Sequence, residues 1–185
     1  INNIISLISL INEEDVKEET IISEYLNLVV TSSEQLKEYI NKLLTYYSSD
    51  NLIASKTRFP LADLISEINQ IVNANNEAEI VTDFDENLEI ITDRTALSQI
   101  LINIISNGIK YNTTDKPIIK ITNNIVNLKS NISISDNGIG IDTQNFEAIF
   151  QNNKTLSKKD RYGNYGTGLG LSIVKNLTQK INFDI

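Results

Sequence analysis

The sequence predicts an α+β protein in which a helical hairpin, expected to pair as a dimeric four-helix bundle, precedes an α/β sandwich with a mixed sheet. Three observations support this. A heptad pattern runs over residues 20–47, which is typical of helices in coiled coils and bundles. After residue 60, stretches with helical spacing alternate with strand-like stretches. All seven glycines lie at Gly108 or later, so the tight turns belong to the second part.

Composition and charge limit what the chain can do. Hydrophobic residues make up 41% and charged residues 22% of the 185 residues, which is typical of a soluble globular protein. The net charge of −8 argues against a nucleic acid partner, because duplex binders need a basic surface. The sequence has no Cys and no His, which excludes disulfides, thiolate metal sites and imidazole catalysis within it.

Two further absences concern location and completeness. No stretch approaches the roughly 18 apolar residues of a membrane-spanning helix. We therefore expect a cytoplasmic chain that reaches a membrane only through regions outside it. Because Met is absent even at position 1, we expect the chain to be part of a longer product.

Residues 1–50 are predicted to form a dimerisation hairpin. Residues 1–11 combine Ile and Leu with polar residues at helical spacing, which indicates a mostly buried helix. Two helices cannot enclose a heptad core alone, so we expect a homodimer. A simple oligomerisation stalk would show the same pattern. The heptad positions of the second helix are Ile22, Leu26, Val29, Ser33, Leu36, Ile40, Leu43 and Tyr47.

A linker over residues 51–60 is predicted to end at Pro60, and a second domain over residues 61–185. The first two strands of this domain are joined by Asp85–Asn87, so we expect them to pair as a hairpin within a mixed sheet. This order differs from the βαβαβ repeat of a dinucleotide fold. The predicted elements are helix 61–72, strands 78–84 and 88–92, helix 95–111, strands 117–123 and 132–136, helix 171–180 and strand 181–185.

Two of these predicted elements carry polar residues at positions that suit ligand binding. Asn103, Asn107 and Lys110 share one face of helix 95–111, where they could present amide oxygens and a cation; a solvated polar face is the alternative. Asp136 ends a strand and is followed by two closely spaced glycines, which leave backbone room for a flat ring. A plain Asn-Gly turn would explain the first glycine alone.

The glycine-rich run GTGLGL, residues 166–171, leads directly into an apolar helix, so its backbone N–H groups could face a phosphate chain. Before it, residues 150–165 form a polar segment with four basic side chains and one Asp. A segment of this length in a compact domain is typical of a lid, although a solvated loop is the alternative. Neither a P-loop nor a dinucleotide fingerprint is present.

Taken together and in order, residues 103–111 (NIISNGIKY), residues 135–141 (SDNGIGI), Phe150 and residues 166–171 (GTGLGL) resemble the N, G1, F and G2 boxes of sensor histidine kinases. That ATP-binding domain has the Bergerat fold, shared by the GHKL superfamily of Hsp90, MutL and DNA gyrase B. The resemblance covers residues 61–185, and the preceding hairpin is similar to the dimerisation and phosphoacceptor domain of the same kinases.

The resemblance implies roles for individual residues. Asp136 would accept a hydrogen bond from the adenine amino group, and Asn107 would be the ligand of Mg²⁺. Asn107 and Lys110 would serve catalysis, Asn103 and Lys110 would contact phosphates, and Tyr111 would flank the nucleotide. The other residues assigned to nucleotide binding are Gly138, Gly140, Phe150, Lys154, Gly166, Thr167, Gly168, Leu169, Gly170 and Leu171.

The reaction implied is transfer of the γ-phosphoryl group of ATP to a histidine. The related ATPases carry a Glu one turn before Asn107, because water needs a positioned base, whereas this chain has Asn103. The family's acceptor histidine would lie about two turns before Ile1, and a response regulator receiver domain would take the phosphate. The parent could be an inner-membrane sensor. The alternatives are a GHKL-type ATPase, a serine-directed kinase and a non-catalytic nucleotide-sensing dimer module.

Three features depart from the family pattern. Asn153 stands where a second aromatic residue is common, and Gly108 replaces the usual alanine, at a helix-propensity difference of about 1 kcal/mol. The chain also ends at residues 181–185 (INFDI), before the final strands expected of the domain.

Overall fold

The computed structural model describes residues 25–33, 36–37, 40, 55–126, 129–151, 154–156 and 158–185. The chain divides into two compact units, Ile1–Tyr47 and Ser48–Ile185. The described residues of the first unit are helical. Most of the predicted hairpin, including residues 1–24, lies outside the described residues, so the hairpin and its dimer stay predictions. No helix in the part of the chain that the structure describes is long and apolar enough to cross a membrane.

The second unit contains three helices and five strands among its described residues, and the three predicted helices are confirmed to within one residue at each end. Two short 3-10 turns precede the last helix. The elements are β1 (Lys56–Pro60), α3 (Leu61–Val72), β2 (Glu79–Asp83), β3 (Glu89–Asp93), α4 (Arg94–Lys110), β4 (Ile118–Val126), β5 (Lys129–Asp136), η1 (Thr143–Asn145), η2 (Ala148–Phe150) and α5 (Gly170–Lys180).

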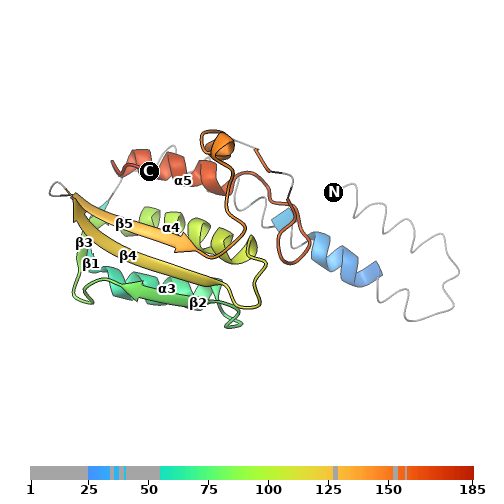
Figure 1. The fold of residues 1–185 in the computed structure, drawn as a ribbon, viewed down its shortest axis with the longest axis horizontal. Helices are drawn as coiled ribbons and strands as arrows, with labels where there is room; N and C mark the ends of the chain where they lie inside the picture. The colour runs from blue at the N-terminus through green and yellow to red at the C-terminus, as the bar shows by residue number, and fades with distance from the viewer. Residues whose placement is uncertain are drawn as a thin grey trace, which may run out of the picture. The chain divides into compact units, whose positions relative to one another are not determined.

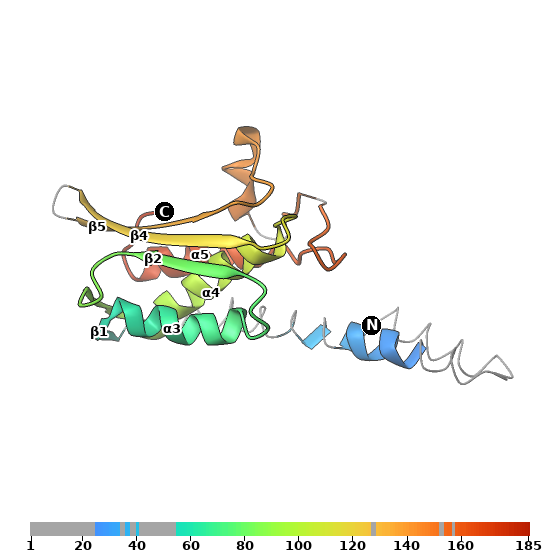
Figure 2. The same ribbon diagram turned by 60° about the horizontal axis from the view of Figure 1, so that its bottom comes forward.

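The strands form a three-stranded mixed sheet and a separate two-stranded ladder. In the larger sheet β4 lies between β2, to which it is parallel, and β5, to which it is antiparallel. Helices α3, α4 and α5 all lie on one face of this sheet (Figures 1 and 2). Along β4, Ile119 and Ile121 are fully buried under the helices, while Lys120 between them is exposed. The second unit is therefore the predicted two-layer α/β sandwich with a mixed sheet.

The hairpin predicted between the first two strands is wrong. Asp85 does form a turn, since its carbonyl accepts from Leu88 N at 2.9 Å and its carboxylate accepts from Asn87 N at 2.9 Å. The turn, however, directs the chain into the other sheet, where β3 pairs with β1 and not with β2. The physical reason is burial, because Ile90 of β3 packs into the core together with Phe59 of β1.

Two end segments also differ from expectation. Residues 56–60 of the predicted linker form β1, and Phe59 is only 7% exposed. The predicted strand 181–185 does not form. Asn182 has a φ of 57°, a left-handed conformation that ends helices, and Phe183 N donates to Thr178 O at 2.8 Å. The chain after α5 is therefore folded back on the helix and is not extended.

The hydrophobic core lies between the sheet and helices α3 and α4. Its members alternate along the strands and recur at helical spacing along the helices, which is the pattern that burial of one face requires. The buried residues of this core are Phe59, Leu61, Leu64, Ile65, Ile68, Ala78, Ile90, Leu97, Leu101, Ile105, Ile109, Ile119 and Ile121.

We expect Asp93→Ala to destabilise the second unit by about 1–2 kcal/mol. Asp93 caps α4, because one of its carboxylate oxygens accepts from Ala96 N at 2.8 Å and the other accepts from Ser55 N at 2.9 Å. Urea unfolding followed by circular dichroism measures the change. Asp93→Asn, which keeps a capping oxygen, is the matched control and should lose less. Equal midpoints for Asp93→Ala and the unsubstituted chain would contradict this role.

Candidate functional site

Two polar residues of α4, Asn103 and Asn107, lie against the start of α5. Asn103 is only 6% exposed, and its amide nitrogen donates to Gln99 O at 2.8 Å. A Cβ built on Gly170, the first residue of α5, would lie 3.1 Å from Asn103 Oδ1 and 3.8 Å from Asn107 Nδ2. The backbone at the start of α5 therefore rests on both asparagines, and the alternative of a solvated polar face does not hold for Asn103.

Asp136 is brought to the same helix from the sheet. It ends β5 opposite Ile119 of β4, and its Oδ1 accepts from Gly138 N at 2.8 Å. A Cβ on Gly108 would lie 3.3 Å from the Cβ of Asp136 and 2.7 Å from Ile119 Cδ1. Gly108, the residue after Asn107, therefore lies where α4 comes close to the end of β5. This is the position at which the sequence has glycine in place of the usual alanine.

The turn that follows β5 docks on the end of α4. A Cβ on Gly138 would lie 2.7 Å from Tyr111 O, and Ile139 N donates to the same carbonyl at 3.2 Å. Gly140 has a φ of 65°, and no described atom lies within 4 Å of the position of its missing Cβ. One glycine allows close backbone contact, and the other allows a left-handed turn beside open space.

Sequence reasoning missed the amide network that holds this turn. Asn137 Oδ1 accepts from Asn112 Nδ2 at 2.7 Å and from Ile118 N at 2.8 Å. Asn112 is 1% exposed, and its own oxygen accepts from Thr114 N at 3.0 Å. The Asn-Gly pattern could have indicated Asn137 as a turn residue. No spacing marks Asn112, because its partner lies 25 residues away.

The GTGLGL run lies against α4 at both ends. At its start, a Cβ on Gly166 would overlap Tyr111 Oη, and at its end Gly170 rests on Asn103. Between them Gly168 has a φ of 70°, and Leu169 is 3% exposed. Leu169, the N-cap residue of α5, makes no side-chain capping bond, so this residue does not satisfy the backbone N–H groups of the first turn.

Tyr111 is the side chain on which the start of this run rests. Partial burial, assisted by the charge of Asp160, raises the pKa of the Tyr111 hydroxyl above its usual range. The hydroxyl is therefore protonated at neutral pH. Thr167 Oγ1 accepts from Leu169 N at 3.4 Å, and Leu171 is half-buried.

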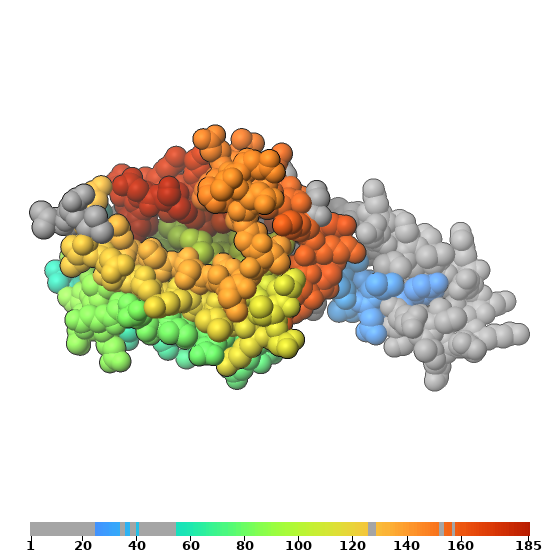
Figure 3. All heavy atoms as spheres, in the orientation of Figure 1, coloured from blue at the N-terminus to red at the C-terminus, as the bar shows by residue number. Residues whose placement is uncertain are grey.

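Phe150 and Lys154, the predicted lid residues, lie before this run. Phe150 ends η2, is half-buried, and belongs to a turn that packs against α5. Lys154 has an exposed side chain. Asn153 lies outside the described residues. The space-filling view shows a hollow between α5 and β5 with atoms of α4 at its floor (Figure 3).

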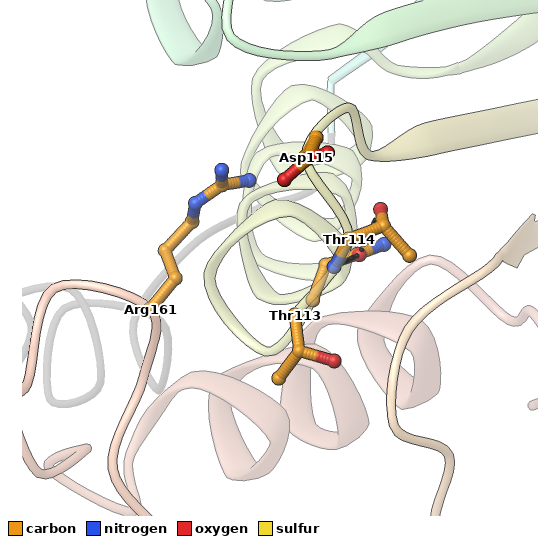
Figure 4. Close-up of a pocket in the computed structure, with 5 residues that line it drawn as sticks. Thr113, Thr114, Asp115 and Arg161 are labelled. Atoms are coloured by element: carbon orange, nitrogen blue, oxygen red, sulfur yellow. Dashed lines mark hydrogen bonds between the residues drawn. The ribbon is translucent and has the colours of Figure 1, made fainter.

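A second, open hollow lies beside the end of α4 and is separate from the pair formed by Asp136 and Asn107. Figure 4 shows Arg161 on one side of it and Thr113, Thr114 and Asp115 on the other; Asn112 completes its lining. Arg161 N donates to Lys110 O at 2.8 Å, while Arg161 Nη1 is buried without a hydrogen-bond partner among the described residues.

We expect Gly166→Ala to weaken nucleotide binding by about tenfold, because the added methyl group would displace the run from Tyr111 Oη and overpacking typically costs about 1–3 kcal/mol. Tyr111→Phe should rescue it, since the new Cβ would lie 3.7 Å from Cζ of Tyr111, an ordinary contact. Titration with a fluorescent ATP analogue measures both variants. Full affinity in Gly166→Ala alone would show that the run does not need this contact.

Comparison with known proteins places about half of the chain in one family. Residues 92–185 match the family of histidine kinase-, DNA gyrase B- and HSP90-like ATPases. The matched residues begin in β3 and include all of α4, β4, β5 and α5. The chain therefore belongs to this family of ATPase domains.

Several of its curated relatives are named as sensor kinases. The chain is 32% identical over 188 residues to the uncharacterized sensor-like histidine kinase ycf26 of Pyropia yezoensis, covering 88% of this chain and 27% of that protein. It is 27% identical over 183 residues to the sensor protein kinase WalK of Staphylococcus haemolyticus, covering 96% and 30%. The chain spans about a quarter of the length of the curated relatives it matches.

Solved histidine kinases share the fold. The catalytic domain of ThkA is 29% identical with a TM-score of 0.57, over 69% of this chain and 82% of that one. ThkA in complex with the response regulator protein TrrA gives a TM-score of 0.72 at 22% identity, over 98% and 52%. Full-length ShkA in complex with AMPPNP gives 0.70 at 20% identity, over 98% and 38%.

Proposed function

We propose that the chain is the core of an ATP-dependent protein-histidine kinase of a two-component signalling system. The observation that carries the proposal is the meeting of three elements at one end of α4. Asp136 from β5, Asn107 from α4 and the start of α5 converge there. Glycines at 108, 138 and 170 allow these elements to approach closely, because a Cβ at each position would lie 3.1 Å or less from a neighbouring atom.

The residues present suit Mg·ATP. Asp136 offers a carboxylate to the adenine amino group, beside a turn whose Gly138 admits no side chain. Asn107 offers the neutral oxygen that a hard cation such as Mg²⁺ accepts as a ligand, with phosphate oxygens and water completing its shell. Lys110 and the N-terminal turn of α5 would face the phosphates, where the helix dipole favours negative charge. Asn103, which is only 6% exposed beneath Gly170, would support that turn from below.

The character of Asn103 supports phosphoryl transfer over hydrolysis. An amide cannot take a proton from water, and the amide nitrogen of Asn103 is already bonded to Gln99 O at 2.8 Å. A histidine nitrogen is nucleophilic without a base and attacks the γ-phosphorus as the bond to the β-phosphate oxygen breaks. Mg²⁺ would neutralise developing charge on the phosphates. Positioning by Asn107 and Lys110 would then supply the remaining catalysis.

The proposed partners follow from the same reading. We propose homodimerisation through the hairpin of residues 1–50, an acceptor histidine outside the 185 residues, and a receiver domain of a response regulator as the next phosphate acceptor. ThkA, which has a similar fold, is bound to a response regulator in one of its structures. The alternatives are a GHKL-type ATPase and a nucleotide-sensing dimer module.

The test is phosphoryl transfer from γ-labelled ATP to the full-length gene product that contains this chain. We expect the protein to become labelled, with the label lost in acid and stable in base, as a phosphohistidine requires. Phosphate release without protein labelling would favour the ATPase alternative. Nucleotide binding without either would favour the sensing module, and both outcomes would overturn the kinase proposal.

A further inference from the structure

Residues 159–165, here called the return segment, lead from the lid into the GTGLGL run and form a closed turn. Lys159 and Tyr165 pair as an antiparallel bridge, and Asp160 N donates to Asn164 O at 2.8 Å. The carboxylate of Asp160 accepts from Tyr162 N at 3.0 Å and from Asn164 N at 2.8 Å. The left-handed Gly163, with a φ of 83°, completes the turn. These bonds give the segment a defined shape of its own.

A backbone and a side-chain hydrogen bond between described residues join the return segment to the rest of the second unit. One joins backbone atoms, since Arg161 N donates to Lys110 O at the end of α4. The other joins side chains, since Tyr162 Oη donates a hydrogen bond to Glu77 Oε2. Glu77 lies between α3 and β2, 85 residues from Tyr162 in the sequence. The segment is thus fixed to two separate elements of the sandwich.

The hydrogen bond between Tyr162 and Glu77 can orient the return segment, although it buries little apolar surface. Tyr162 is 52% exposed, so its ring is not anchored in the core. Glu77 is oriented by Asn75, whose Nδ2 donates to the other carboxylate oxygen at 3.2 Å. The hydrogen bond from Tyr162, assisted by that from Asn75, lowers the pKa of Glu77, so the acceptor stays charged at neutral pH. A charged acceptor makes the stronger hydrogen bond.

Gly166 follows the return segment immediately, and this connection links the bond to the nucleotide site. The close approach of Gly166 to Tyr111 Oη and of Gly170 to Asn103 Oδ1 requires the backbone before them to be in place. Fixing a glycine-rich segment costs conformational entropy. A contact that pre-orders the segment removes part of that cost from ligand binding.

We propose that Tyr162 and Glu77 are positioning residues of the nucleotide site, whose side-chain bond orders the GTGLGL run for the phosphates of ATP before the nucleotide binds. Neither residue needs to touch the nucleotide. The proposal rests on the nucleotide-binding function proposed above. It adds a role for two residues that no motif contains.

The first test is a double-mutant cycle on Mg·ATP affinity with Tyr162→Phe, Glu77→Ala and the double variant. We expect each single substitution to weaken binding about threefold to tenfold and the double variant to be no weaker than the singles, because all three lose the same bond. Glu77→Gln keeps an acceptor oxygen and should retain part of the affinity. Tyr165→Phe, the loss of one hydroxyl from a 64% exposed ring in the same segment, is the matched control and should bind normally.

Binding of adenosine, which lacks phosphates, should be unchanged in every variant. Additive losses in the cycle, or equal losses for ATP and adenosine, would overturn the proposal. A lower unfolding midpoint with unchanged ATP affinity would also overturn it, since the bond would then serve stability alone.

Amide hydrogen exchange without nucleotide separates this proposal from the proposed function. We expect faster exchange over residues 160–165 in Tyr162→Phe and Glu77→Ala than in the unsubstituted chain. This result does not require ATP to bind, so a chain that fails to bind ATP can still show the ordering. Unchanged exchange in both variants would show that the bond does not order the return segment, even if ATP binds well.

Discussion

Asp136→Asn is expected to lower the affinity for ATP by about 10-fold to 100-fold, because it removes a charge-assisted hydrogen bond of about 1.5–3 kcal/mol. An asparagine at this position can present its amide nitrogen to the exocyclic carbonyl oxygen, O6, of guanine. The affinity for GTP should therefore not fall, and the preference for ATP over GTP should decrease. Competition of ATP and GTP against a fluorescent ATP analogue measures both quantities.

Asp142→Asn provides the matched control for this experiment. Asp142 lies in the same connection after β5, is exposed, and makes no side-chain capping bond to η1. Its substitution changes the net charge by the same amount and should leave both affinities unchanged. An ATP to GTP ratio that is equal in Asp136→Asn and the unsubstituted chain would remove Asp136 from the adenine site.

Asn107→Ala is expected to abolish most of the effect of Mg²⁺ on ATP binding and to slow phosphoryl transfer by about 100-fold or more. The methyl side chain supplies no oxygen to the metal, and losses of supporting groups around metal sites already cost about 10-fold to 100-fold. The measurement is ATP affinity with Mg²⁺ and with a chelator present. The increase in ATP affinity that Mg²⁺ causes should disappear, while the affinity measured with the chelator should stay the same.

Asn107→Asp tests the same assignment from the other direction. It keeps an oxygen for the metal but places a negative charge beside the phosphates, so binding without Mg²⁺ should be weaker than in Asn107→Ala. Asn124→Ala, an exposed position on β4, is the control for loss of an asparagine. A full Mg²⁺ effect in Asn107→Ala would show that the metal ligand lies elsewhere.

The sequence predicted the helices and the residues that meet at α4 because both depend on local spacing. Asn103, Asn107 and Lys110 share a face through the helical repeat alone. Asp136 is placed by the end of an alternating strand. The glycines of the GTGLGL run mark a turn whatever the rest of the chain does.

Features that depend on distant parts of the chain were not predicted. Strand β1 buries Phe59 but exposes Lys56, Thr57 and Arg58, so its sequence lacks the alternation that marks a strand. The predicted partner of β3 was wrong because a turn only shows that the chain reverses its direction. It does not show which strand the chain then pairs with. The bond between Tyr162 and Glu77 joins residues 85 positions apart and leaves no local pattern.

The end of α4 has a consequence for how the second unit can change in evolution. Two consecutive carbonyls, Lys110 O and Tyr111 O, receive Arg161 N and Ile139 N from two different loops. Each residue of an α-helix turns the backbone by about 100° and advances it by about 1.5 Å. Inserting or deleting one residue within α4 would therefore point both carbonyls away from both loops at once. The length of α4 therefore sets the positions of both loops together, so we expect insertions and deletions within the helix not to be tolerated.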